Sequence, residues 1–147
     1  MLRYFHLILV VLACAAVAAV AEPPNATAAP TRMEKRLIVR INHARAAHGL
    51  RRLRIGPRIQ RGAHWWSSHL LRSDSFYHSR LRVGTSEILA WGTCSYFTPR
   101  RAVQMWLRSA GHRPLLLDPT ARYVGTGWTR GGWCGYRCVE MAVARFR

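Results

Sequence analysis

The sequence predicts an α+β fold. Beyond the leader, helical patterns fill the first part of the chain and strand patterns fill the last part, an order typical of that class. The 147 residues suit one domain plus a leader, and 50% apolar against 20% charged residues is a globular composition. A chain made of several domains is therefore excluded.

The first helix is predicted over residues 32–48. An apolar stripe recurs at helical spacing from Met33 to Ala44. Thr31 is a suitable N-cap for this stripe, and Gly49 is a suitable stop. These three signals agree on one amphipathic helix.

Proline marks the start of the later helices. Pro57 precedes a second apolar stripe, which predicts a helix over residues 57–72. Pro99 opens a third helix that we expect to end near Gly111, and Pro114 to Leu117 is predicted to form a short helical turn. The helical part of the fold therefore ends before residue 118.

Two strands are predicted at the end of the chain. Alternation of residue types begins at Tyr123, breaks at a predicted turn over Gly131-Gly132, and resumes from Val139 to Phe146. Residues 73–97 carry mixed signals, and no element is assigned to them. The predicted strands form a hairpin.

The N-terminal residues have the pattern of an export signal. Arg3 precedes an apolar run from Leu7 to Val20, and the run ends in the small-residue cleavage motif Ala19-Val20-Ala21. The run is short for a membrane span. The alternative leader is a lipoprotein anchored through Cys14. The expected organisation is a signal peptide at 1–21, a linker at 22–31 and a domain at 32–147.

Three cysteines follow the leader: Cys94, Cys134 and Cys138. An odd number in an oxidising compartment predicts one disulfide and one free thiol. The spacing leaves the pairing open, because either of the last two residues can reach Cys94 or they can pair with each other.

The charge is strongly positive. Lys and Arg number 23 against 6 acidic residues, for a formal net charge of +17. With so few acids, an enzyme with a crowded carboxylate site does not fit. An exported protein of this charge favours anionic lipid or a cell-wall polymer, with peripheral membrane contact, over nucleic acid. The densest basic cluster comprises Arg51, Arg52, Arg54, Arg58 and Arg61.

Four motifs occur in an order that resembles one family. They are Asn42-His-Ala-Arg45 with Gly49-Leu50, Phe76-Tyr77-His78-Ser79, Ser86-Glu87-Ile88-Leu89-Ala90, and Trp106-x-x-Ser109-x-Gly111-His112-Arg113 followed by Val124-Gly-x-Gly127. Together they resemble the CAP superfamily of cysteine-rich secretory, antigen 5 and pathogenesis-related proteins, in its short bacterial SCP-like form. The resemblance spans about residues 33–146.

The resemblance implies a three-layer α-β-α sandwich around a small, mainly antiparallel sheet. It also implies a cleft with two histidines and two acids. His78, Glu87 and His112 match three of these four positions, and the fourth falls near Ser109. Two departures weaken an acid/base tetrad: the second acid is missing, and Ile88 replaces a family asparagine.

Two chemistries follow for this cleft. His78 and His112, with Glu87 as a third candidate, form a weak open site for zinc or another divalent metal. The same three residues are the only catalytic candidates, and they are weak ones. The alternative is a hydrogen-bonded cluster that shapes a polar cleft.

We therefore expect a secreted, extracytoplasmic binding module for lipid, sterol-like or envelope ligands. A metal-assisted hydrolase or protease that uses the same cleft is the alternative, and an enzyme is the less favoured class. A monomer is favoured, although the sequence does not determine the oligomeric state.

Overall fold

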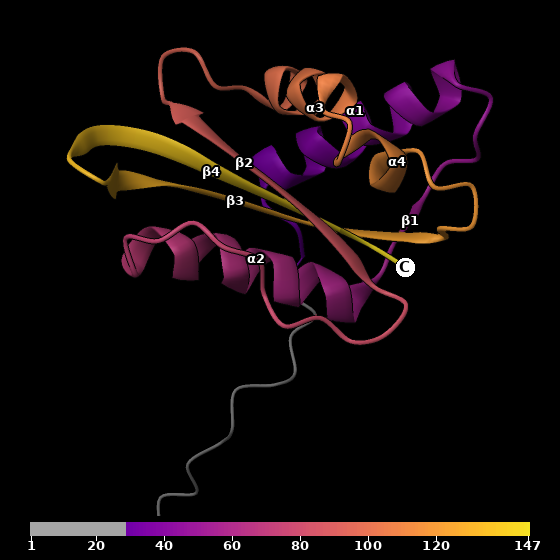
Figure 1. Ribbon diagram of the computed structural model, residues 1–147, viewed down its shortest axis with the longest axis horizontal. Coiled ribbons are helices and arrows are strands. Elements are labelled where there is room, and N and C mark those ends of the chain that lie inside the picture. Colours follow the sequence, from indigo (N-terminus) through magenta and orange to yellow (C-terminus); the bar gives the residue numbers. More distant parts are fainter. Residues whose placement is uncertain (1–28) are drawn as a thin grey trace, which may run out of the picture.

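A computed structural model describes residues 29–147, and they form three layers (Figure 1). A four-stranded sheet lies in the middle. Helices α1 (Arg32–Ala47), α3 (Pro99–Arg108) and α4 (Arg113–Leu116) cover one face, and α2 (Pro57–Arg72) covers the other. The predicted α-β-α sandwich is confirmed. The predicted signal peptide, Cys14 and most of the predicted linker lie outside the described residues.

The sheet is mainly antiparallel, with the strand order β1-β3-β4-β2. The long hairpin of β3 (Tyr123–Trp133) and β4 (Tyr136–Phe146) forms its centre. Strand β2 (Ser86–Thr93) pairs antiparallel with β4, and β1 (Arg54–Ile55) pairs parallel with β3. The β2–β4 pairing places Glu87 opposite Arg145, and this register builds the site described below.

The residues predicted to start the helices stand at the helix starts in the structure. Thr31 forms a capping box with Glu34 at the start of α1, and Pro57 and Pro99 stand in the first turns of α2 and α3. Helix α3 ends at Arg108, three residues before the expected Gly111. Its end comes earlier because Ser109 is extended, with φ −90° and ψ 124°.

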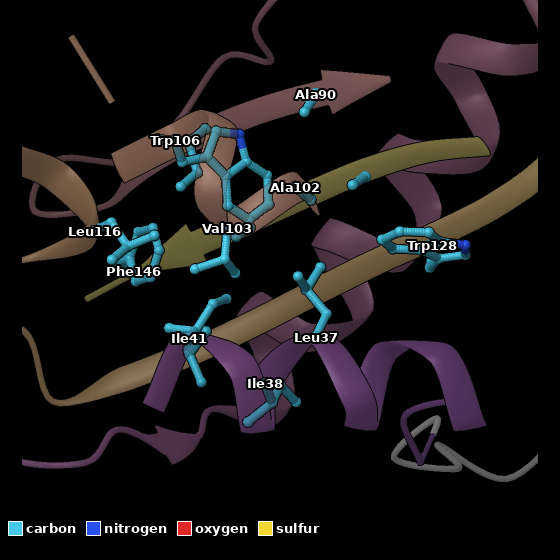
Figure 2. Close-up of a cluster of buried hydrophobic side chains, with 14 of the residues drawn as sticks. Leu37, Ile38, Ile41, Ala90, Ala102, Val103, Trp106, Leu116, Trp128 and Phe146 are labelled. Carbon is cyan, nitrogen blue, oxygen red and sulfur yellow. The ribbon is translucent and has the colours of Figure 1, made fainter. Parts of the chain in front are cut away.

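Two apolar cores hold the layers together, one on each face of the sheet. The larger core joins α1, α3 and α4 to the strands, and Figure 2 shows Trp106, Val103, Leu37 and Ile41 converging within it. The smaller core lies under α2, around Trp66, and includes the strand residues Val139, Met141 and Val143. Within residues 29–147, no helix is long and apolar enough to cross a membrane.

Two glycines let α2 lie directly on the sheet. A Cβ at Gly125 would collide with the backbone of Ile59 and Gln60, and one at Gly127 would collide with the Ala63 carbonyl. Any larger residue would push the helix outward. The Gly125-x-Gly127 pattern of β3 is therefore a packing requirement of this layer.

Two strand predictions need correction. The hairpin turn lies at Cys134-Gly135, both with positive φ, whereas Gly131-Gly132 lie within β3 beside a register shift. Paired positive-φ residues suit the tight turn of a twisted hairpin. Strand β2 lies within residues 73–97, for which the sequence predicts no element.

Candidate functional site

The site is built around the buried carboxylate of Glu87 on β2. One oxygen, Oε2, accepts hydrogen bonds from Ser79 Oγ and Arg145 Nε, both at 2.8 Å. The other, Oε1, accepts from the Ser79 backbone N–H at 2.9 Å and lies 3.1 Å from His78 Nδ1. Arg145 also donates from Nη2 to Ser79 Oγ at 2.8 Å. All the usual acceptor directions of this carboxylate are occupied.

This arrangement orients His78. A carboxylate can only accept hydrogen bonds, so Nδ1 of His78 carries the proton that faces Glu87. The opposite ring nitrogen, Nε2, is then an acceptor in the neutral ring. The His78 side chain is 57% exposed, whereas that of Glu87 is fully buried. The cluster therefore presents one oriented imidazole to solvent.

A mainly apolar cleft of about 310 Å³ lies between β2 and α3. Its lining residues are Phe76, Leu89, Ala90, Trp91, Met105, Trp106, Ser109 and His112. Trp106 is fixed there by a hydrogen bond from Nε1 to the Leu89 carbonyl at 3.0 Å. Only two polar side chains, those of Ser109 and His112, stand among these residues, so the cleft suits an apolar ligand with a polar end.

His112 stands at the start of α4, directly before Arg113. Burial lowers its pKa, and the positive charge of protonated His78 lowers it further. The two imidazoles therefore influence each other, although His78 lines a separate hollow beside Trp65, Tyr77 and Arg145. The structure joins His78 directly to Glu87, and it places His112 with Ser109 in the cleft.

The residues present do not fit a three-ligand metal centre. Among residues 29–147, no group of three His, Cys, Asp or Glu side chains could hold a metal ion. Glu87 already accepts hydrogen bonds through both oxygens, so binding a metal would break its contacts with Ser79 and Arg145. A weak site made by His78 and His112 alone stays a prediction.

A second histidine–carboxylate pair lies elsewhere in the fold. Nδ1 of His64 on α2 is 2.8 Å from Oε1 of buried Glu34 on α1. Glu34 Oε2 also accepts a hydrogen bond from Gln60 Nε2 at 3.3 Å, and the backbone N–H of Trp128 donates to Glu34 Oε1. Through these hydrogen bonds the pair joins α1, α2 and β3. Its role is therefore structural.

Two members of the Glu87 cluster were not identified from the sequence. Ser79 lies in the Phe76–Ser79 motif, but the motif alone predicts no role for it. Arg145 gave no signal, because its position opposite Glu87 depends on the strand register. Asn42 and Arg45, from the first motif, prove structural: Asn42 pairs with the backbone of Leu53, and buried Arg45 donates to the carbonyls of Leu116 and Asp118.

The disulfide joins Cys94 to Cys138, and Cys134 is an exposed free thiol at the hairpin turn. The prediction of one disulfide and one free thiol is confirmed. The bond ties the end of β2 to β4, and β2 carries Glu87 and the cleft residues Leu89 and Ala90.

A model of the cysteine-rich secretory protein family, CAP, matches residues 39–144. The chain belongs to this family. The match covers most of the sequence. It includes the whole cleft and the Glu87 cluster except Arg145, which follows the last matched residue.

The relatives of this CAP domain include an uncharacterised Bacillus subtilis protein, YkwD. It is 27% identical over 130 residues, which cover 78% of the chain and 51% of YkwD. The chain thus spans about half the length of that relative.

Two solved structures share the fold. An outer surface protein from Borrelia burgdorferi matches with a TM-score of 0.61 and 21% identity, over 80% of this chain and 94% of its own. BmVAL-1 matches with a TM-score of 0.61 and 15% identity, over 85% of this chain and 80% of its own.

Proposed function

We propose that this CAP domain is an extracytoplasmic binding module whose cleft takes an apolar ligand with a polar end, such as a lipid or sterol-like molecule of the envelope. The observation that carries the proposal is the cleft of about 310 Å³, walled by Trp91, Trp106 and Met105. Burial of the ligand's apolar part against these side chains supplies the affinity. Ser109 and His112 supply hydrogen bonds to its polar end.

An extracytoplasmic location is supported by two observations. The Cys94–Cys138 disulfide is typical of oxidising compartments. A neighbour in fold, the Borrelia burgdorferi protein, is named an outer surface protein. Export through the predicted leader, rather than anchoring at Cys14, is part of this proposal.

No observation favours the alternative, a metal-assisted hydrolase. Among the described residues, Glu87 is the acid that contacts His78. It accepts hydrogen bonds on both oxygens and so has no free oxygen to take a proton from water. Within the described residues, no acidic side chain lines the cleft beside His112. The Glu87 cluster is better suited to orienting a side chain than to acid–base turnover.

A fluorescent neutral sterol tests the proposal by titration. Met105→Glu places a charge on the cleft wall and should weaken binding at least tenfold, because the apolar contact is lost. Gln104→Glu puts the same charge on the neighbouring exposed position of α3, outside the cleft, and should change affinity less than twofold. Equal affinity in both variants would refute binding in the cleft.

A further inference from the structure

A basic groove with a volume of about 870 Å³ lies between α1 and the start of α3. We define the basic groove by its cationic residues and one histidine: Arg32, Lys35, Arg36, Arg40, His43 and Arg100. Every one of these side chains is exposed. Thr98, Pro99 and Val39 complete the lining.

Among the described residues, no acidic side chain lines the groove to balance its charge. Glu34 is the only acid of α1, and its carboxylate is buried against His64 and Gln60 on the other side of the helix. Within residues 29–147, none of the groove cations forms an ion pair. Their mutual repulsion is therefore uncompensated inside the described domain, and an anionic ligand would relieve it.

The cations lie in a line. Arg32, Arg36 and Arg40 recur every four residues, and His43 follows three residues later, so they follow one face of α1 over about 16 Å. Lys35 lies beside Arg36 at the edge of this row. Arg100, in the first turn of α3, faces this line across the hollow. The amino end of α3 adds the positive pole of a helix dipole at the same place. A row of this kind matches a ligand whose negative charges also repeat along a line.

The shape favours a linear polymer over a membrane surface. A flat bilayer would meet the rim of an 870 Å³ hollow and leave its floor uncovered, whereas a chain can lie inside it. Among the described residues that line the groove, Val39 is the only exposed large apolar one, so this lining offers no aromatic anchor that could insert into lipid.

We infer that the basic groove is a second binding site, distinct from the apolar cleft, and that it takes a linear polyanion with repeating phosphate-like groups, such as a phosphodiester polymer of the envelope. The cluster at Arg51–Arg61, which is denser in sequence, does not form this hollow. Helices α1 and α3 pack against each other through the larger core (Figures 1 and 2). This packing brings the basic residues of both helices to one groove.

Three probes test this inference by titration: long-chain polyphosphate, inorganic phosphate, and vesicles of phosphatidylglycerol with phosphatidylcholine. The test variant is Arg36→Gln/Arg40→Gln in the groove. The matched control is Arg61→Gln/Arg72→Gln, which removes two exposed charges from α2 on the opposite face of the sheet. Circular dichroism verifies that both variants are folded.

The expected result is a loss of at least tenfold in polyphosphate affinity for the groove variant and less than twofold for the control. The slope of log affinity against log salt should also fall by about two in the groove variant alone, because two fewer charges are neutralised. Vesicle binding should fall equally in both variants.

Three outcomes would overturn the inference. Equal loss of polyphosphate affinity in both variants would mean that diffuse charge is responsible. Loss of vesicle binding without loss of polyphosphate binding in the groove variant would identify a membrane surface. Binding of inorganic phosphate as tightly as polyphosphate would mean a site for a single anion. Sterol binding in the cleft should be unchanged throughout, so this test is independent of the proposed function.

Discussion

At the scale of single residues, Glu87 determines the geometry of the site. Its buried carboxylate accepts hydrogen bonds from Ser79, His78 and Arg145 together. A buried charge is tolerated only when its hydrogen bonds are complete. The cluster therefore links the loop before β2 to strands β2 and β4, and it holds one imidazole in a fixed orientation.

Replacing Glu87 with glutamine should destabilise the fold by about 3 kcal/mol. An amide has one acceptor oxygen, so it would leave donors of Ser79 or Arg145 without a partner. Ser79→Ala, which removes one hydroxyl from the same cluster, should cost only about 1 kcal/mol. Urea unfolding of both variants measures the difference, and equal losses would contradict the central role of the carboxylate.

His112 should titrate below the ordinary histidine pKa of 6.5, because burial and the charge of His78 both lower its pKa. The unfolded chain then binds the proton more readily than the folded chain. The free energy of unfolding should therefore fall as the pH drops from about 6.5 towards the lower folded pKa. NMR titration of the imidazole signals measures this midpoint.

The His78→Ala variant separates the two causes of the His112 shift. Removing the charge of His78 should raise the His112 midpoint towards 6.5, and the part of the shift caused by burial should remain. His69→Ala is the control, because His69 does not contribute to the lowered pKa of His112. Its ring contacts Trp65, Trp66 and Tyr77 instead. An unchanged midpoint in His78→Ala would show that the two imidazoles do not interact.

At the scale of elements, helix α2 depends on glycine in the strand below it. Gly127→Ala would press a Cβ into the Ala63 carbonyl, which is helix backbone and cannot move aside. We expect a loss of about 3 kcal/mol in unfolding free energy. Gly132→Ala, in the same strand but with only ordinary contacts, should change it by less than about 0.5 kcal/mol. Similar urea midpoints for the two variants would be inconsistent with this packing.

The helices were predictable because their signals are local. The range 57–72 follows from Pro57 and an apolar stripe, and the structure has the same bounds. Strand β2 was missed because Glu87 to Ala90 are all buried, so the strand lacks the alternation that marks a half-exposed strand. The hairpin turn was predicted at Gly131-Gly132 because a pair of glycines is a strong turn signal in a sequence. The actual turn lies at Cys134-Gly135, where Cys134 adopts a positive φ although it is not a glycine.

The site was only partly predictable for a related reason. His78, Glu87, Ser109 and His112 were proposed from a family resemblance in local motifs. Arg145 was not, because it reaches Glu87 only through the β2–β4 register. The basic groove was also invisible in the sequence, since Arg100 joins α1 through tertiary packing.

At the scale of the whole molecule, the disulfide fastens the end of β2 to β4. The oxidised protein should present one titratable thiol, Cys134, because Cys94 and Cys138 are bonded. A thiol assay on the native protein should count one thiol per chain, and none in Cys134→Ser. Any thiol remaining in Cys134→Ser would contradict the pairing.

The whole domain combines an apolar cleft at β2 and α3 with a separate cationic groove at α1 and α3. Neither feature requires turnover chemistry. Both suit a protein that binds to components of a cell envelope, and both use α3, whose apolar face builds the larger core. Binding of an apolar ligand in the cleft is the central claim.

Native mass spectrometry of the protein purified from its own envelope tests that claim most directly. The proposal predicts that the natural protein carries a bound apolar molecule, seen as an added mass that is lost on dissociation. The same added mass should be present in Gln104→Glu and absent from Met105→Glu. A natural protein that carries no added mass, or an adduct that persists undiminished in Met105→Glu, would contradict binding in the cleft.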